Sequence, residues 1–349
     1  MTKVSSEKRI LVALSGGVDS SVAAALLQES GDHTEGAIMI LEGMKEESID
    51  FAERVTERLH IPFHRFDFRQ EHQEEVINYF VKEYQLGRTP NPCVLCNKII
   101  KFSLFMQKAQ EMGMDSMATG HYAGIEKTNS RYLLKKGIDN TEQSYFLYRL
   151  DQKQLSKTIF PLEQYTKDEV RAVARKHKLP TAKRKKSQDV CFIPDGDYTS
   201  LLKTRIPENP GPILKNDGKQ VGQHKGIIHY TIGQRHGIGI SHKSPYYVTK
   251  IDVEKNAIYI GEKEQVYRKE FIARDLNFIP FDVLEDSMDV SAKVRYFSPL
   301  SEALVEPVGR DKVKVMFKKP QWAITPGQSA VFYKESLVIG GGIIDTVLD

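Results

Sequence analysis

The chain has 349 residues, of which 40% are hydrophobic and 28% are charged, and its formal net charge is +4. These values are typical of a globular protein of two or three domains, and they exclude a disordered chain. No apolar run approaches membrane-spanning length, and the polar first nine residues lack the apolar core of a secretion signal, so we expect a cytoplasmic protein with no membrane partner.

The N-terminal stretch predicts a buried strand, a tight turn and a helix. Residues 10–14 are apolar, Gly16 and Gly17 interrupt them, and Ser20 and Ser21 stand at cap-type positions before a run rich in Ala and Leu. Glycine amides, a helix start and serine hydroxyls together favour a bound phosphate. Asp19 either orients this turn or meets a Mg²⁺ ion carried by the nucleotide. An ordinary strand-to-helix turn is the alternative.

Residues 15–21 read Ser-Gly-Gly-Val-Asp-Ser-Ser. The Lys of a Walker A motif and the third Gly of a dinucleotide fingerprint are both missing. The string instead resembles the PP-loop of the ATP pyrophosphatases, and that resemblance implies adenylation of a carbonyl oxygen with release of pyrophosphate.

Alternating strand and helix patterns continue through the first half of the chain. They predict an α/β fold with a doubly wound parallel sheet, whose ligands bind at the carboxyl ends of the strands. We expect strands at 36–41, 61–68, 115–122 and 132–134, helices at 49–59, 71–84, 99–112, 151–155 and 167–177, and a loop at 87–98.

Beyond Pro194 the pattern changes to prolines, glycines and short strands. A strand-like stretch at 230–235 and a hairpin at 246–261 that turns near Asn256 predict a small central β-rich domain. Strands at 290–296, 312–317, 330–333 and 337–344 predict a C-terminal β-barrel. We therefore expect domains at 1–205, 206–270 and 271–349. Eight Lys and Arg residues against two acidic residues between Lys203 and Lys250 predict contact with phosphate groups, or else a solvated lysine surface.

The three cysteines, Cys93, Cys96 and Cys191, are too few for a disulfide framework and suit a reducing compartment. Cys96 lies just before the helix expected at 99–112, with Lys98 and Lys101 nearby, and Cys191 follows the basic run 183–186. Neighbouring cations favour the thiolate form, so both are candidate reactive thiols. The alternatives are small buried hydrophobic residues, or three metal ligands with one coordination position left open.

A series of motifs in chain order resembles that of the tRNA-specific 2-thiouridylases of the MnmA type, and the match runs from Ser15 to about Asp345. The motifs are residues 87–92, 95–98, 100–102, 118–123, 143–147, 187–192 and 230–235. The resemblance implies ATP-dependent 2-thiolation of the wobble uridine, position 34, of tRNA. The C2 carbonyl oxygen would be adenylated, sulfur would come from a protein persulfide, and AMP and pyrophosphate would be released.

The resemblance also assigns residues and partners. It makes Cys96 the nucleophile and Cys191 the persulfide carrier, with a disulfide between them expected in the cycle. ATP and Mg²⁺ are the implied cofactors, and the partners are the tRNA anticodon stem-loop and a persulfide or sulfide donor protein. The matching positions are Ala13, Leu14, Ser15, Gly16, Gly17, Val18, Asp19, Ser20, Met39 and Gly120 for ATP, Asn91, Pro92 and Cys93 for the target base, and Thr141, Glu142, Gln143, Arg295 and Tyr296 for tRNA.

Two departures from the family pattern keep alternatives open. The family has Asp where this chain has Cys93, and it has a longer insertion where this chain has only residues 42–46. The extra thiol motivates the hypothesis that Cys93, Cys96 and Cys191 ligate a [4Fe–4S] cluster whose free iron handles sulfide. Other candidates are a PP-loop ligase such as an argininosuccinate or GMP synthetase, and a non-catalytic RNA-binding protein with a zinc-stabilised loop.

Overall fold

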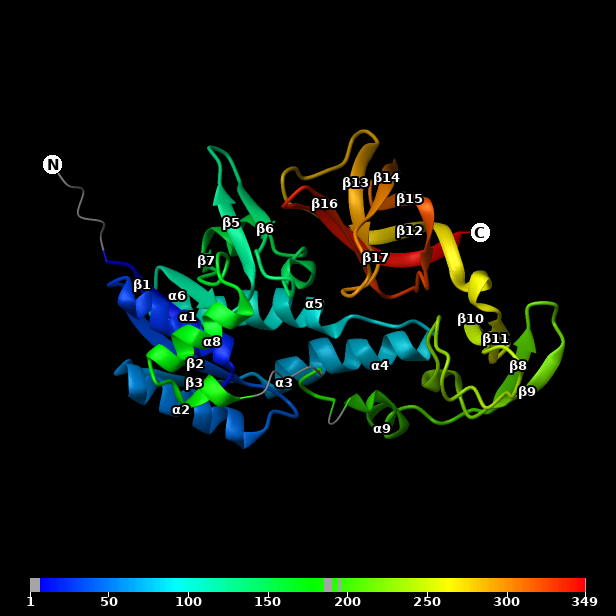
Figure 1. The fold of residues 1–349 in the computed structure, drawn as a ribbon, viewed down its shortest axis with the longest axis horizontal. Coiled ribbons are helices and arrows are strands. Elements are labelled where there is room, and N and C mark those ends of the chain that lie inside the picture. The colour runs from blue at the N-terminus through cyan, green and yellow to red at the C-terminus, as the bar shows by residue number, and fades with distance from the viewer. Residues whose placement is uncertain (1–6, 185–189, 194–195, 349) are drawn as a thin grey trace. The chain divides into compact units, whose positions relative to one another are not determined.

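The computed structural model describes residues 7–184, 190–193 and 196–348 (Figure 1). The chain divides into two compact units. Unit 1 comprises Met1–Val76, Cys93–Pro194 and Ser336–Ile339, and unit 2 comprises Ile77–Pro92, Asp195–Glu335 and Gly340–Asp349. No helix in the described part of the chain is both long and apolar enough to cross a bilayer.

Unit 1 is built on a five-stranded parallel sheet of order β3-β2-β1-β4-β7, which confirms the predicted α/β class. The central strand β1 has every residue from Ile10 to Leu14 buried, so both of its faces are covered. The strands are β1 (Arg9–Leu14), β2 (His33–Ile40), β3 (Phe63–Asp67), β4 (Ser116–Thr119) and β7 (Thr158–Ile159).

Helices cover both faces of this sheet. Helices α1 (Val18–Glu29), α2 (Glu46–Leu59) and α8 (Lys167–Lys176) pack on the face formed by Ile10, Val12 and Leu14. Helix α6 (Phe105–Glu111) contacts β1 and β4. The remaining α- and π-helical segments of unit 1 are α3 (Arg69–Glu71), a π-helical stretch (His72–Ile77), α5 (Pro92–Cys96), a second π-helical stretch (Asn97–Leu104) and α7 (Gln152–Ser156). The first π-helical stretch and α5 each cross a unit boundary by one residue.

The loop predicted at 87–98 is wrong in its second half. Helical structure begins at Pro92 and continues through α5, the second π-helical stretch and α6. Proline at the first helical position loses no intrahelical hydrogen bond and its fixed φ suits a helix, so the Pro that suggested a loop in fact starts the helix. A hairpin of β5 (Ala123–Lys127) and β6 (Tyr132–Lys136) completes unit 1, and only β6 was predicted.

Unit 2 contains α4 (Asn78–Gln85), α9 (Tyr198–Lys203) and two β-structures. The first is a four-stranded sheet of order β10-β11-β8-β9, made of β8 (Gly211–Lys215), β9 (Gln220–His224), β10 (Tyr247–Asp252) and β11 (Ala257–Gly261). The predicted hairpin is confirmed, with Asn256 at φ +45° in its turn. The strand-like prediction for 230–235 is wrong, because these residues form turns in which Gly233 has φ +85°.

The second β-structure is the predicted C-terminal barrel. Six antiparallel strands follow the order β12-β15-β14-β13-β16-β17, and pairing of β12 with β17 closes the sheet and removes its free edges. They are β12 (Tyr267–Phe278), β13 (Met288–Lys293), β14 (Ser301–Val308), β15 (Lys312–Trp322), β16 (Ser329–Lys334) and β17 (Leu337–Leu348). Strands β12 and β14 were not predicted.

Candidate active site

The turn between β1 and α1, where anion binding is predicted, lies at residues 15–17. Gly16 has φ +69°, and a Cβ atom there would overlap the Ser48 carbonyl oxygen and lie 2.8 Å from the Arg184 guanidinium, so only glycine fits. Gly17 caps α1, which corrects the prediction that Ser20 and Ser21 are caps. Both serines lie inside the first turn and donate their hydroxyls to the Gly17 carbonyl, at 3.2 and 2.7 Å. The Ser20 hydroxyl also accepts the Ser15 amide at 3.1 Å.

Asp19, the acidic residue of this turn, is bonded within the protein. Its carboxylate accepts hydrogen bonds from the Lys167 ammonium at 2.5 and 2.7 Å and from the Tyr122 hydroxyl at 2.7 Å. Lys167 is the first residue of α8, whose start is fixed by a capping box between Thr166 and Glu169. These bonds tie Asp19 to α8 and balance its negative charge with Lys167, which fits the predicted orienting role; the role in meeting Mg²⁺ stays a prediction.

Gly120 and Met39, the two ATP positions predicted outside the turn, follow or end neighbouring strands. A Cβ atom on Gly120 would lie 2.5 Å from the Ser20 amide, so this glycine lets the end of β4 approach the start of α1. Met39 is buried near the end of β2. His121 accepts or donates a 2.8 Å bond at Nδ1 to the Thr119 hydroxyl. Burial lowers its pKa well below the usual value, and Lys101 lowers it further, so the ring is neutral.

Arg184 is a site residue that the sequence did not reveal. Its guanidinium donates to the Gly16 carbonyl at 2.6 Å and to the Ser48 hydroxyl at 3.2 Å, and it lies 4.6 Å from the centre of the Phe51 ring. The sequence had suggested that the run 183–186 acts on Cys191. Arg184 instead fixes the phosphate-binding turn, while residues 185 and 186 lie outside the described part of the chain.

Cys93 and Cys96 lie in helix α5, not before a helix as predicted, and one turn separates them. Burial raises the pKa of Cys93 to about 11 and that of Cys96 to about 12, and Lys101 opposes both shifts. The Cys191 side chain is exposed, yet neighbouring protein atoms that exclude water from its sulfur raise the pKa of the thiol. The positive charge of Lys101 opposes this shift. These pKa shifts oppose the expected thiolate forms, because burial outweighs the neighbouring cation. All three cysteines are free thiols.

Cys191 lies in a short described stretch, 190–193, whose Phe192 is buried. The Phe192 ring meets the edge of the His72 ring at 5.4 Å. Gly43, within the shortened segment 42–46, has φ +77°, and a Cβ atom there would lie 2.9 Å from the Phe192 Cα. These contacts fix the residue next to Cys191. The motif residues 187–189 lie outside the described residues.

Metal binding by the three thiols finds no support in the geometry. Across residues 7–184, 190–193 and 196–348, no group of three or more His, Cys, Asp or Glu side chains is placed to hold a metal ion. Cys93, Cys96 and Cys191 do not form a ready ligand set for an iron–sulfur cluster in this arrangement.

The residues predicted to contact tRNA have side chains that bond within the protein. The Thr141 hydroxyl donates to Asp139, the buried Glu142 carboxylate accepts the Ser144 amide at 2.8 Å, and the Gln143 side chain accepts the Tyr122 amide at 3.2 Å. In unit 2, the Arg295 guanidinium donates to the Ile232 carbonyl at 2.9 Å and to the Thr325 hydroxyl at 2.6 Å. Asn91 and Pro92 end the unit 2 segment 77–92, and Cys93 begins the next segment of unit 1.

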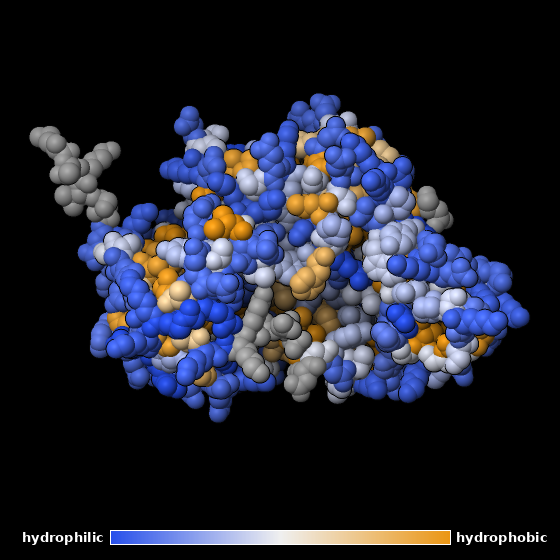
Figure 2. Space-filling model, in the orientation of Figure 1, coloured by the Kyte–Doolittle hydropathy of each residue, from blue (hydrophilic) through white to orange (hydrophobic). Residues whose placement is uncertain are grey.

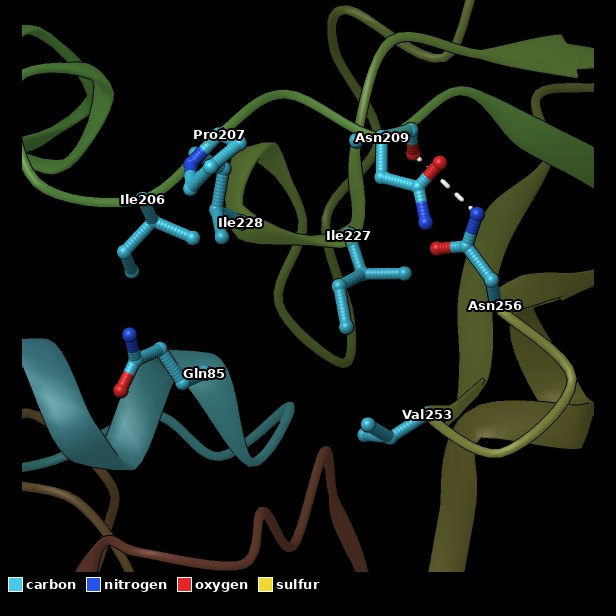
Figure 3. Close-up of a pocket in the computed structure, with 9 residues that line it drawn as sticks. Gln85, Ile206, Pro207, Asn209, Ile227, Ile228, Val253 and Asn256 are labelled. Atoms are coloured by element: carbon cyan, nitrogen blue, oxygen red, sulfur yellow. Dashed lines mark hydrogen bonds between the residues drawn. The ribbon is translucent and has the colours of Figure 1, made fainter.

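A small pocket of about 180 Å³ lies within unit 2 (Figure 3). Ile206, Pro207, Ile227 and Val253 supply apolar walls, and Asn256 donates to the Asn209 carbonyl at 3.2 Å at its rim. None of the predicted ATP, sulfur or target-base residues lines this pocket.

A parallel sheet with an anion-binding turn after its central strand, followed by a small β-sheet and a closed barrel, defines a nucleotide-binding protein of the HUP class. Three family models match in this order: a tRNA methyl transferase HUP domain over residues 8–195, a tRNA methyl transferase PRC-barrel domain over 199–262, and an aminomethyltransferase beta-barrel domain over 268–344.

Curated relatives match almost the whole chain. A tRNA-specific 2-thiouridylase MnmA 2 of Thermoanaerobacter sp. (strain X514) is 48% identical over 97% of this chain and 98% of its own length. A tRNA-specific 2-thiouridylase MnmA 1 of Clostridium botulinum (strain Loch Maree / Type A3) is 46% identical over 97% of this chain and 99% of its own. The chain belongs to the family of tRNA-specific 2-thiouridylases.

Proposed function

We propose that this protein is a tRNA-uridine 2-sulfurtransferase that uses ATP to convert the wobble uridine, position 34, to 2-thiouridine. The activity named for its relatives supports this function. The family models carry names of methyl transfer, but a phosphate-binding turn and free thiols suit adenylation and sulfur transfer better than transfer of a methyl group.

The observation that carries the proposal is the packing of the thiol-bearing helical segment beside the end of β4. Cys96 ends α5 and leads directly into the second π-helical stretch, whose Phe102 ring lies 5.8 Å from the His121 ring. His121 follows Gly120, whose backbone closely approaches Ser20 at the start of α1. This packing within unit 1 supports a site shared by the candidate ATP residues and Cys96.

This arrangement suits chemistry at the C2 carbonyl of uridine. The carbonyl oxygen is a poor leaving group until adenylation turns it into a phosphate ester. The amides and hydroxyls of the turn would hold the departing pyrophosphate. Mg²⁺ would neutralise phosphate charge, and it would arrive on the nucleotide, because the Asp19 carboxylate is already bonded to Lys167 and Tyr122.

We propose Cys191 as the persulfide carrier and Cys96 as its partner. When the Cys96 sulfur attacks the Cys191 sulfur, the bond between Cys191 and its outer sulfur breaks. Hydrosulfide leaves, and a Cys96–Cys191 disulfide forms. The hydrosulfide attacks C2 and expels AMP. An external dithiol then reduces the disulfide. In the alternative order, the outer sulfur of the Cys191 persulfide attacks C2 directly and expels AMP, so that Cys191 is joined to the base through a disulfide. The Cys96 sulfur then attacks the Cys191 sulfur, which releases 2-thiouridine and forms the Cys96–Cys191 disulfide.

The remaining assignments form part of the same proposal. We propose domains at 1–205, 206–270 and 271–349, with the target base held near Asn91, Pro92 and Cys93. The anticodon stem-loop is the proposed substrate, because its bases are already largely unstacked. A persulfide donor protein would load Cys191 by passing its outer sulfur to the Cys191 thiolate and leaving as a thiolate. A sulfide donor would serve only the cluster alternative. Free thiols at these positions suit a reducing cytoplasm.

The proposal is tested with the purified protein, ATP, unmodified tRNA and a persulfide donor that can pass its outer sulfur to Cys191. We expect 2-thiouridine by nucleoside mass spectrometry, with pyrophosphate release, and we expect Cys96→Ser and Cys191→Ser each to abolish the product. Cys93→Ser tests the third thiol of α5 separately: because Cys93 belongs to the proposed base-holding residues, the KM for tRNA should rise, while product should still form at saturating tRNA.

Three outcomes would contradict the proposal. Turnover retained in both serine variants would favour another PP-loop ligase. Tight zinc without ATP-dependent pyrophosphate release would favour an RNA-binding protein. Iron with absorbance near ~400 nm in anaerobically purified protein, together with loss of product in Cys93→Ser, would replace the persulfide with a [4Fe–4S] cluster.

A further inference from the structure

One aromatic side chain of the barrel unit is presented almost entirely to solvent. Phe297 is 94% exposed, whereas the other exposed large hydrophobic residues of the described chain reach 57% at most. Hydrophilic side chains cover most of the face drawn in Figure 2, and apolar ones form separate small patches. A fully exposed phenylalanine leaves apolar area in water that burial would otherwise stabilise by about 25 cal/mol per Å².

Phe297 sits at the tip of a tightly bonded turn that follows β13. The Ser298 hydroxyl accepts the amides of Val294 and Arg295 at 3.2 Å each and donates to the Arg295 carbonyl at 2.8 Å. The Ser298 amide closes the turn on the same carbonyl at 3.1 Å. Tyr296 lies edge-to-face against the Phe297 ring at 4.7 Å. The ring is thus held outward by a fixed backbone, which reduces the entropy lost when a partner binds.

Arg295 anchors this turn to the segment 230–235. Its guanidinium donates to the Ile232 carbonyl at 2.9 Å and to the Thr325 hydroxyl at 2.6 Å, both within unit 2. This segment belongs to the stretch between Lys203 and Lys250 that carries an excess of six positive charges. Arg235, three residues beyond Ile232, forms no ion pair among the residues that the structure describes. Through Arg295, the turn that carries Phe297 is joined to the segment that contains Arg235.

An exposed aromatic ring next to unpaired cations is the combination that binds unpaired nucleotides, because every base offers a flat face for stacking while cations meet its phosphate. We propose that Phe297 stacks on an unpaired nucleotide of the bound tRNA, and that Arg295 is a positioning residue for this turn and not a direct RNA contact. The inference rests on the proposed tRNA substrate. A protein partner or a second copy of this chain would use the same ring without RNA.

The test compares Phe297→Ala and Phe297→Tyr with Val283→Ala, a control at a 57% exposed apolar residue of the same unit. Stacking is worth about 1–3 kcal/mol per base, so the Kd for the tRNA should rise by roughly five- to hundredfold in Phe297→Ala. Phe297→Tyr should keep near wild-type affinity, and Val283→Ala should not differ from wild type. The KM for tRNA should rise in Phe297→Ala while the Kd for ATP and the melting temperature stay unchanged.

Salt dependence separates stacking from phosphate contact. Phe297→Ala should leave the slope of log affinity against log salt unchanged, and Arg235→Gln should lower it by about one. Unchanged tRNA affinity in Phe297→Ala would overturn the inference. So would an equal loss in Phe297→Tyr, or a change only in self-association or in binding of the sulfur donor. If wild-type protein does not thiolate tRNA, the proposed function itself fails, which is a separate result.

Discussion

The ion pair between Lys167 and Asp19 neutralises the carboxylate of the turn where we propose that the ATP phosphates bind. Asp19 is the second residue of α1, beside the expected position of the ATP phosphates, and Lys167 balances its charge through two contacts at 2.5 and 2.7 Å. In Lys167→Met the carboxylate keeps only the Tyr122 hydroxyl as a partner among these contacts. We expect this variant both to lose stability and to bind ATP more weakly.

The expected losses of stability and of ATP affinity in Lys167→Met follow from the exposure of the ion pair and from its charges. The Lys167 and Asp19 side chains are 20% and 28% exposed, so the pair is partly screened by water. A hydrogen bond to a charged group contributes about 1.5–3 kcal/mol, and we expect a loss near the lower end, about 2 kcal/mol. Two unit charges about 8 Å apart repel by about 1.4 kcal/mol at an effective dielectric constant of about 30. That repulsion weakens ATP binding by about tenfold.

Urea denaturation and calorimetric titration with ATP measure the two effects. Lys176→Met is the matched control, because Lys176 also joins α8 to α1, through Glu29 at 3.1 Å, but is 70% exposed. We expect that control to change stability by no more than about 0.5 kcal/mol and to leave ATP binding unchanged.

A double-mutant cycle decides whether charge balance is the cause. Adding Asp19→Asn to Lys167→Met removes the unbalanced carboxylate, so ATP affinity should return to within about threefold of wild type. Two results would refute the reasoning: wild-type ATP affinity in Lys167→Met alone, or strictly additive losses in the double variant.

Three further predictions concern the turn, the thiols and a buried histidine. Gly16→Ala should abolish ATP binding because its Cβ would overlap the Ser48 backbone, whereas Gly31→Ala, at φ +85° in open space, should lose only about 1–2 kcal/mol of stability and keep ATP binding. Because burial holds the Cys96 pKa near 12, its alkylation rate should rise about tenfold per pH unit from pH 7 to 10; a plateau near pH 8 would contradict this. Burial lowers the His72 pKa to about 4 from an unfolded value near 6.5, so stability should be complete above pH 6.5 and fall by up to about 1.4 kcal/mol per unit toward pH 4, a slope that His72→Phe should remove.

The parts of the fold that sequence predicts best are those with local signals. The apolar run of β1 and the capping box before α8 each lie within a few residues, and both elements form where expected. Strands β12 and β14 escaped prediction because only one face of each enters the barrel core. Their other faces carry exposed or half-buried charges such as Lys269, Glu270 and Glu302, which weaken an apolar pattern.

The candidate site also contains residues that the sequence reveals through local patterns and residues that it does not reveal. The glycines and serines of the turn are contiguous, so their chemistry can be read from the chain. Lys167 and Arg184 reach the turn across 148 and 168 residues, and no local pattern marks such partners. The thiol pKa values show a second limit. Neighbouring cations are visible in sequence, but burial depends on the tertiary structure, and here burial has the larger effect on Cys96.

The most direct test of adenylation at the uridine follows one oxygen atom. An anticodon stem-loop synthesised with ¹⁸O at C2 of the wobble uridine is incubated with the protein, ATP and a persulfide donor, and the released AMP is examined by mass spectrometry. We predict one ¹⁸O atom in each AMP phosphate, in step with 2-thiouridine formation, and loss of 2-thiouridine in Cys191→Ser. AMP without the label, or 2-thiouridine formed without AMP, would contradict the account.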